Sequence, residues 1–140
     1  VRMNEDLTSV YGEHVLVSTP TEPWEKLSRD PLWNEGPCML KYGGRYFLSY
    51  SINFFASDHY GIAVSVADCP MGPFVKMEDN PRLSKAQGIR GPGHNAYFTG
   101  FDGKLYSVLH IRDVMPDGKV DRMACVTEVK LDENGVHFND

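Results

Sequence analysis

The chain has 140 residues, of which 41% are hydrophobic and 24% charged, and its formal net charge is -5. This length and composition are typical of one globular domain. The negative charge and the scattered basic residues argue against nucleic acid as a partner, and no apolar run reaches the roughly 20 residues that a membrane span needs.

The N-terminus and the cysteines say little about cellular location. The chain begins with Val1 and shows no signal-peptide pattern, which suggests that an upstream segment, for example a secretory signal, was removed or omitted. Cys38, Cys69 and Cys125 make an odd number without CxxC spacing. A disulfide framework and a structural zinc site are therefore not expected, and the redox compartment stays undetermined.

The first 34 residues contain one predicted strand, at residues 13–18, followed by a turn-rich connection at residues 19–24. Residues 22–27 have room for one helical turn. Elsewhere helix signals are scarce, because the 13 Gly and 9 Pro interrupt most windows long enough for a helix. Apolar residues alternate with polar ones, so the sequence predicts an all-β fold.

From residue 35 onward, one pattern occurs twice, about 55 residues apart. Each unit has a Gly-Pro pair, an apolar stretch, a glycine turn followed by a basic residue, and an aromatic-rich strand. The glycine turns are hairpin signals, because their residues tolerate positive φ. The matching segments are the strands at 46–51 and 105–110, expected to be equivalent inner strands, the polar connections at 53–59 and 113–119, the third strands at 60–66 and 122–127, and the fourth strands at 74–77 and 136–138.

Four short antiparallel strands in each such unit are typical of a propeller blade. The sequence therefore predicts a partial β-propeller: residues 1–34 form the outer strand and crossover of a preceding blade, residues 35–83 the first complete blade, and residues 84–140 the second. A propeller closes only with roughly four to eight blades. We expect the open blade face to be covered by missing blades of a longer protein or by a self-association partner.

The repeat places Glu35 and His94 at points that the sequence indicates to be equivalent, where a strand begins in each unit. A carboxylic acid there can donate a proton, and a histidine there can face the same pocket. The residues alone leave structural roles open, since Glu35 can cap a strand or pair with a lysine and His94 can be a structural histidine. For His59 and His110 a structural or surface role is expected.

Aromatic residues lie near both candidates. Trp24, Trp33, Phe54 and Phe55 can form a sugar-stacking platform, since aromatic faces suit the apolar side of a pyranose, or they can pack inside and between blades. Phe54 and Phe55 fall in a loop between strands, which favours the pocket.

This ordered set of motifs resembles the second half of a glycoside hydrolase family 43 catalytic domain, a five-bladed β-propeller that acts on arabinose- and xylose-containing glycans. The resemblance covers residues 33–130, and its specificity lies in the order of the motifs. They are Glu35-Gly36-Pro37, residues 46–51, residues 60–65, Gly72-Pro73-Phe74, Gly91-Pro92-Gly93-His94-Asn95 and residues 106–112.

The resemblance implies a role for each matched residue. Glu35 corresponds to the family's general acid. His94 corresponds to a histidine at the propeller axis that often helps to hold a calcium ion through water, and Arg112 to an arginine in the sugar pocket. The family also needs an aspartate general base and a second aspartate that tunes and orients the acid. Neither motif is present in the chain, and the aspartates that match neither are Asp6, Asp30 and Asp58.

Inverting glycoside hydrolysis needs an acid for the leaving oxygen and a second carboxylate, about 6.5–9.5 Å away, to activate water. Glu35 supplies half of this, so we expect the isolated chain to have little or no activity. The leading hypothesis is a fragment of such an enzyme, with an oligo- or polysaccharide as partner. The alternatives are a carbohydrate-binding propeller without activity and a structural or interaction β-domain. The resemblance implies a secreted or periplasmic protein and leaves a cytoplasmic one open.

Overall fold

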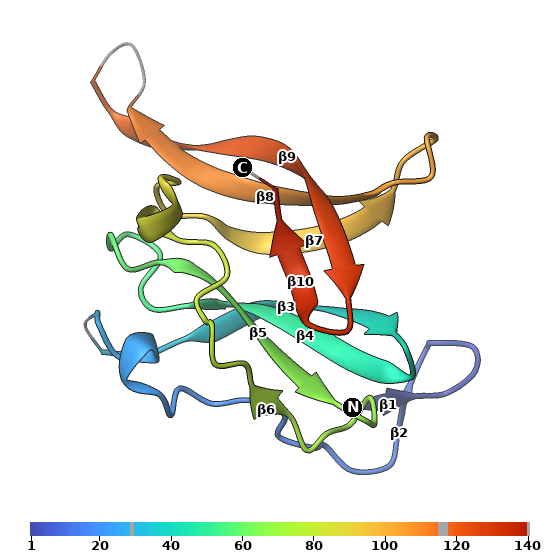
Figure 1. The fold of residues 1–140 in the computed structure, drawn as a ribbon. Coiled ribbons are helices and arrows are strands. Elements are labelled where there is room, and N and C mark those ends of the chain that lie inside the picture. Colours follow the sequence, from blue (N-terminus) through green and yellow to red (C-terminus); the bar gives the residue numbers. More distant parts are fainter. Residues whose placement is uncertain (29, 115–117, 140) are drawn as a thin grey trace.

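The computed structural model describes residues 1–28, 30–114 and 118–139, and these form the all-β fold that the sequence predicts. Two four-stranded antiparallel sheets lie one above the other (Figure 1). In that part of the chain, helix is confined to two single-turn 3₁₀ segments, η1 (Pro23–Glu25) and η2 (Lys85–Gln87). The first sheet contains β3 (Asn34–Tyr42), β4 (Arg45–Ile52), β5 (Gly61–Ala67) and β6 (Val75–Lys76), and the second β7 (Gly93–Thr99), β8 (Leu105–Val114), β9 (Val120–Asp132) and β10 (Gly135–Phe138).

Both sheets follow a simple up-and-down order, β3-β4-β5-β6 and β7-β8-β9-β10. The β3–β4 hairpin turns at Gly43 and Gly44, which both have positive φ, as the sequence predicts. The two strands expected to be equivalent, β4 and β8, take the second place in their sheets and are flanked on both sides. The first places belong to β3 and β7. Of the second polar connection, residues 115–117 lie outside the described residues.

The first strand of each sheet contains a β-bulge at the same point. Pairing with β4 jumps from Glu35 to Cys38, and pairing with β8 jumps from Gly93 to Ala96. Gly36 and His94 therefore occupy equivalent positions, one residue after Glu35 and Gly93. The sequence interpretation that Glu35 and His94 are equivalent is off by one residue. That interpretation aligned the two Gly-Pro pairs with each other. The first pair lies inside the bulge of β3, whereas the second lies before β7 begins.

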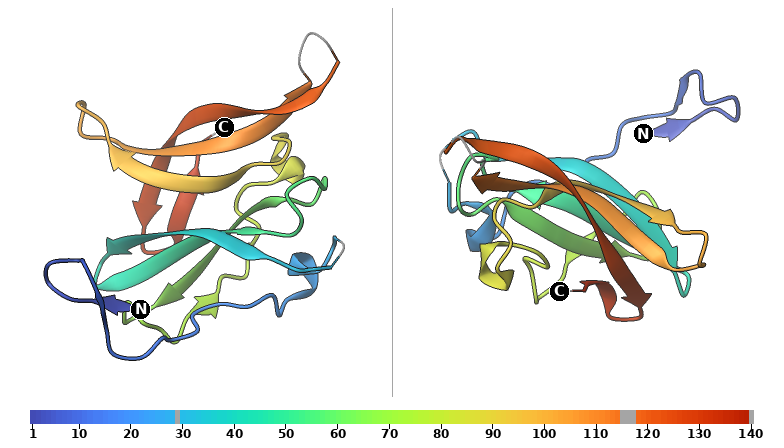
Figure 2. Two further views of the ribbon diagram at one scale, coloured as in Figure 1. Left: turned by 180° about the vertical axis from the view of Figure 1, so that it is seen from behind. Right: turned by 90° about the horizontal axis from the view of Figure 1, so that it is seen from above.

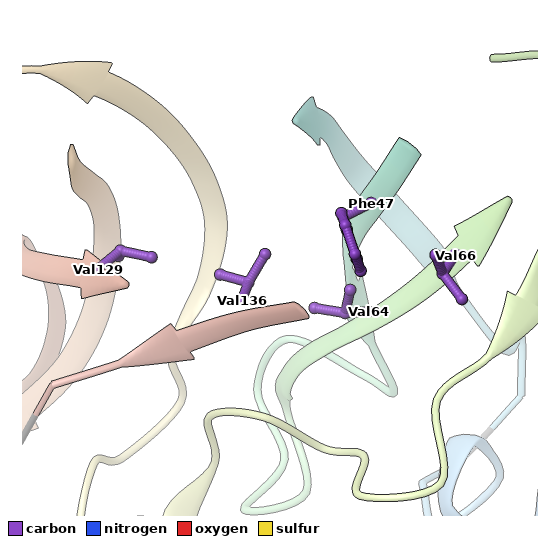
Figure 3. Packing of buried hydrophobic residues seen from close by; sticks show 5 residues of the cluster. All are labelled: Phe47, Val64, Val66, Val129 and Val136. Atoms are coloured by element: carbon purple, nitrogen blue, oxygen red, sulfur yellow. The ribbon is translucent and has the colours of Figure 1, made fainter. Parts of the chain in front are cut away.

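Strand β4 is buried on both faces. Phe47 points toward the second sheet and, with Val64 and Val66 of β5, packs against Val129 and Val136 (Figure 3). These side chains join the two sheets into one core, and Figure 1 shows the two sheets from the side. Every second residue of β4 faces the other side of the sheet, away from Phe47, because side chains alternate across a strand.

The N-terminal segment covers that opposite face. Val17 and Trp24, with Phe74, pack against four buried residues of the first sheet, which are Leu48, Tyr50, Ile52 and Ala63. The strand predicted at residues 13–18 is absent, since this segment makes no ladder hydrogen bonds and packs through side chains. The strands found before residue 34 are instead β1 (Arg2–Met3) and β2 (Val10–Tyr11), a hairpin that extends away from the two sheets (Figure 2).

One buried carboxylate fixes this segment to the sheet. Glu25 is fully buried, and its side chain accepts hydrogen bonds from the backbone N–H groups of Thr21 and Glu22. The Tyr50 hydroxyl donates to the same side chain, and Lys76 of β6 forms an ion pair with it. A fully buried charge persists only with such partners.

The face of the second sheet that points away from the first sheet contains exposed apolar residues. Ala96, Val108 and Val126 are direct cross-strand partners and so share one face, and all three are exposed. Phe98, two residues along β7, is 44% exposed. The expectation that missing blades or a second copy cover such a face stays a prediction. No described helix is long and apolar enough to cross a membrane.

We expect Lys76→Met to destabilise the fold strongly, because it removes the counter-ion of a fully buried carboxylate. Loss of one partner of a buried ion pair typically costs about 3–5 kcal/mol, to be measured as the free energy of unfolding in urea. Lys104→Met is the matched control, since the Lys104–Glu128 pair is exposed and should contribute little. Equal stability of the two variants would contradict this role for Glu25.

Candidate active site

Glu35 and His94 lie next to each other at the bulged ends of β3 and β7. His94 Nδ1 is 3.9 Å from Glu35 Oε1, and the two side chains are 49% and 34% exposed. A Cβ placed on Gly36 would lie 2.8 Å from Cδ2 of the His94 ring. The absence of a side chain at residue 36 therefore lets the imidazole approach β3.

Hydrogen bonds from the second bulge to β4 hold this arrangement. The His94 backbone N–H donates to Ser51 Oγ over 2.8 Å, and Asn95 Nδ2 donates to Ser49 Oγ over 3.0 Å. His94 has a φ of 50°, in the left-handed region that residues with a side chain rarely occupy. Strained backbone of this kind is common at functional sites.

Tyr60 connects the two candidates. Its ring is fully buried, and its hydroxyl lies 2.9 Å from Glu35 Oε1 and 3.1 Å from His94 Nδ1. A hydroxyl has one proton, so when Tyr60 donates to Glu35 it accepts from a protonated His94 Nδ1. Burial raises the pKa of Tyr60, which keeps the hydroxyl protonated. The sequence offered no sign of this role, because Tyr60 reads as the first residue of a strand.

His110 closes the group from the second sheet. Its ring stacks at 5.8 Å from Tyr60 and at 5.8 Å from His94. Burial lowers the pKa of His110, and the positive charge of Arg122 adds to this effect. The buried Nε2 atom has no hydrogen-bond partner among the described residues. His110 was expected to be structural or at the surface, and the structure places it beside both site candidates.

Arg122 is the arginine whose charge acts on this group. Its guanidinium lies 4.8 Å from the centre of the Phe55 ring. Its positive charge acts to lower the pKa of both Tyr60 and His110. Arg112, its cross-strand partner, has its side-chain carbons against Gly91 instead, and it is among the charges that lower the pKa of Asp58, after Lys85 and Arg90. Arg112 was singled out through the family resemblance, and the β8–β9 pairing that brings Arg122 alongside it is not visible in the sequence.

Three of the four aromatic candidates form one cluster. The ring centroids of Trp33 and Phe54 are 5.1 Å apart, and those of Phe54 and Phe55 are 4.6 Å apart. Phe55 is 39% exposed. Trp24 belongs elsewhere, since it packs against the outer face of the first sheet. The predicted platform is thus reduced to three rings, with the Arg122 guanidinium over the Phe55 ring.

The described residues do not make a calcium site by themselves. Calcium takes six to eight oxygen ligands, and no group of three or more His, Cys, Asp or Glu residues in the described ranges could hold a metal ion. His94 is partly exposed, so it can contact a water molecule, and Glu35 is the carboxylate that the structure places beside it. A calcium ion at the propeller axis stays a prediction.

Comparisons with known proteins agree with this fold. The model of the glycosyl hydrolases family 43 matches residues 1–137. A thermostable family-43 glycoside hydrolase of known structure has 35% sequence identity and a TM-score of 0.85, over 99% of this chain and 45% of that one. An endo-1,4-beta-xylanase from Bacteroides thetaiotaomicron has 31% identity and a TM-score of 0.83, over 99% and 48%.

Curated relatives point the same way. A beta-D-galactofuranosidase from Aspergillus niger is 28% identical over 135 residues, which is 96% of this chain and 36% of that protein. An extracellular exo-alpha-(1->5)-L-arabinofuranosidase from Streptomyces avermitilis is 30% identical over 118 residues, 78% of this chain and 24% of that protein. The chain belongs to glycosyl hydrolase family 43 and spans less than half the length of these relatives.

We expect His110 to titrate below the ordinary histidine pKa of about 6.5, because burial and Arg122 both lower its pKa. As the pH falls through about 6.5, His110 is protonated in the unfolded chain before it is protonated in the folded one. The unfolded state then binds more protons, so lowering the pH in this range destabilises the fold. NMR titration of the ring should show the low midpoint, and Arg122→Gln should raise it. His110→Asn should remove this part of the acid destabilisation. A midpoint above 6.5 would contradict the assignment.

Proposed function

We propose that the chain is part of an inverting glycoside hydrolase for arabinose- or xylose-containing glycans, with Glu35 as its general acid. The observation that carries the proposal is the placement of Glu35, at a bulge beside His94, hydrogen-bonded through Oε1 and 34% exposed. A proton donor must reach its substrate, and this carboxyl group is open on one side. Family membership supports the reaction class.

Glu35 carries out one step of the proposed reaction. Its proton passes to the glycosidic oxygen as the bond from that oxygen to the sugar carbon breaks and the electron pair stays on the oxygen. Water attacks the carbon from the opposite face and loses a proton to the general base. Among the clustered site residues Glu35 is the one carboxylate, which supports the expectation that the base comes from another part of the protein.

Apart from the galactofuranosidase, the names of the relatives support the substrate class. They include the arabinofuranosidase, an arabinoxylan arabinofuranohydrolase from Paenibacillus polymyxa and the endo-1,4-beta-xylanase. We infer that Arg122 and the rings of Trp33, Phe54 and Phe55 contact the glycan, with Arg122 preferred over Arg112. Aromatic rings suit sugar faces, and a guanidinium suits hydroxyl acceptors.

The exposed Phe55 ring and Arg122 also suit a carbohydrate-binding protein without activity. Such a protein needs the aromatic cluster and the arginine, and has no use for a proton donor at residue 35. The two functions therefore differ in what replacement of Glu35 does.

In the complete protein, we expect Glu35→Gln to lower turnover of substrates with poor leaving groups by about 10²–10⁴-fold, the usual effect of general acid catalysis. The loss should be much smaller for activated aryl glycosides, whose leaving group needs no proton. Steady-state kinetics on both substrates test this, with the 140-residue chain alone expected to be inactive. Equal losses on both would mean that Glu35 positions the sugar, and intact activity with intact binding would remove Glu35 from the reaction.

Replacing the two arginines separately should show which one contacts the sugar. We expect Arg122→Gln to raise KM by about tenfold, in line with the 1–3 kcal/mol lost when a buried or bound group loses a partner, and Arg112→Gln to change it little. The two residues are direct cross-strand partners, so each is the other's control. A larger effect at Arg112 would restore the assignment made from the sequence.

A further inference from the structure

Tyr60 is the described residue that touches both Glu35 and His94 through one atom. Its ring is completely buried, while the two side chains that it contacts are partly exposed. The hydroxyl therefore reaches the candidate acid from the protein side, at Oε1. Among the described contacts of Glu35, those with Tyr60 and His94 are both made through Oε1, and the other carboxyl oxygen, Oε2, takes part in neither.

The packing around the Tyr60 ring holds its hydroxyl beside Glu35. A Cβ placed on Gly93 would lie 2.1 Å from Cε1 of Tyr60 and 2.8 Å from its hydroxyl oxygen. Any larger residue at position 93 would collide with the ring. The stacked His110 ring lies on Tyr60 as well, so the hydroxyl has little freedom to leave Glu35.

We propose that Tyr60 is a positioning residue for the general acid: its hydroxyl donates to Glu35 Oε1, which keeps the transferable proton on Oε2. A protonated carboxyl group has one accepting oxygen and one that carries the proton. Because Tyr60 supplies a donor to Oε1, that oxygen is the acceptor. The proposal rests on the function proposed for Glu35.

The same hydrogen bond strengthens as the reaction proceeds. Before proton transfer Tyr60 donates to a neutral carboxylic acid, and after it Tyr60 donates to a carboxylate. Hydrogen bonds to an ionised acceptor are roughly twice as strong as neutral ones. An interaction that is stronger in the transition state than in the ground state raises kcat and leaves KM unchanged. Tyr60 therefore favours release of the proton without touching the sugar.

The first sheet contains a matched control. Tyr50 is also buried, and its hydroxyl also donates to a glutamate, Glu25, over 3.2 Å. That glutamate is fully buried on the opposite face of the sheet. Tyr60→Phe and Tyr50→Phe thus remove the same chemical group from the same kind of partner, and each leaves a packed ring in place.

The experiment compares these two variants in the complete protein. For Tyr60→Phe we expect kcat to fall about tenfold on glycosides with poor leaving groups and less than about twofold on activated aryl glycosides, with KM unchanged, which reflects the extra strength of a charge-assisted hydrogen bond. Tyr50→Phe should lower stability and leave kcat within about twofold on both substrates. Equal effects of the two variants, or a loss at Tyr60 that does not depend on the leaving group, would overturn the proposal.

A second measurement does not need activity. NMR should show a slowly exchanging Tyr60 hydroxyl proton in the unmodified protein, and Glu35→Gln should shift its signal. A hydroxyl signal that is indifferent to Glu35→Gln would overturn the proposal even if Tyr60→Phe failed to fold. If Glu35→Gln itself shows no dependence on the leaving group, the proposed function fails. If Glu35→Gln shows it and Tyr60→Phe does not, only the role of Tyr60 fails.

Discussion

The hydrogen bonds between the bulge of β7 and two serines of β4 are the interaction on which the site depends. Ser51 accepts the backbone N–H of His94, and Ser49 accepts from Asn95. These bonds fix the second sheet against the first at the edge where Glu35 lies. Without them, the core formed by Phe47 and Val136 would still join the sheets, but Tyr60 would not reach both His94 and Glu35 with one hydroxyl.

Strand β4 serves two different environments through its alternating side chains. One face supplies small hydroxyl groups and Phe47 to the contact between sheets. The other supplies Leu48 and Tyr50 to the core under the N-terminal segment, where Glu25 is sealed from water. The same pairing of tyrosine with glutamate occurs on both faces. Solvent access makes the difference, because Glu25 is closed off and Glu35 is partly open.

Much of the fold could be predicted because it depends on local patterns. Gly43-Gly44 determines a hairpin, and the aromatic-rich segments that follow the glycine turns identify β4 and β8. The strand predicted at residues 13–18 was wrong, since a strand needs a partner and local pattern does not supply one. Glu35 was accessible through its motif. Tyr60 and Arg122 were not, because the roles proposed for them depend on the approach of β7 to β4 and on the β8–β9 register, which are contacts between distant residues.

The two bulges solve one geometric problem with different residues. At position 36 the left-handed backbone is occupied by glycine, which adopts it freely, and at position 94 by histidine, with nearly the same φ. Such a conformation costs a residue with a side chain roughly 1–2 kcal/mol. Shape alone would be satisfied by glycine at both places. The imidazole at 94 therefore costs folding free energy that a glycine would not, and the fold carries this cost at the edge where the candidate acid lies.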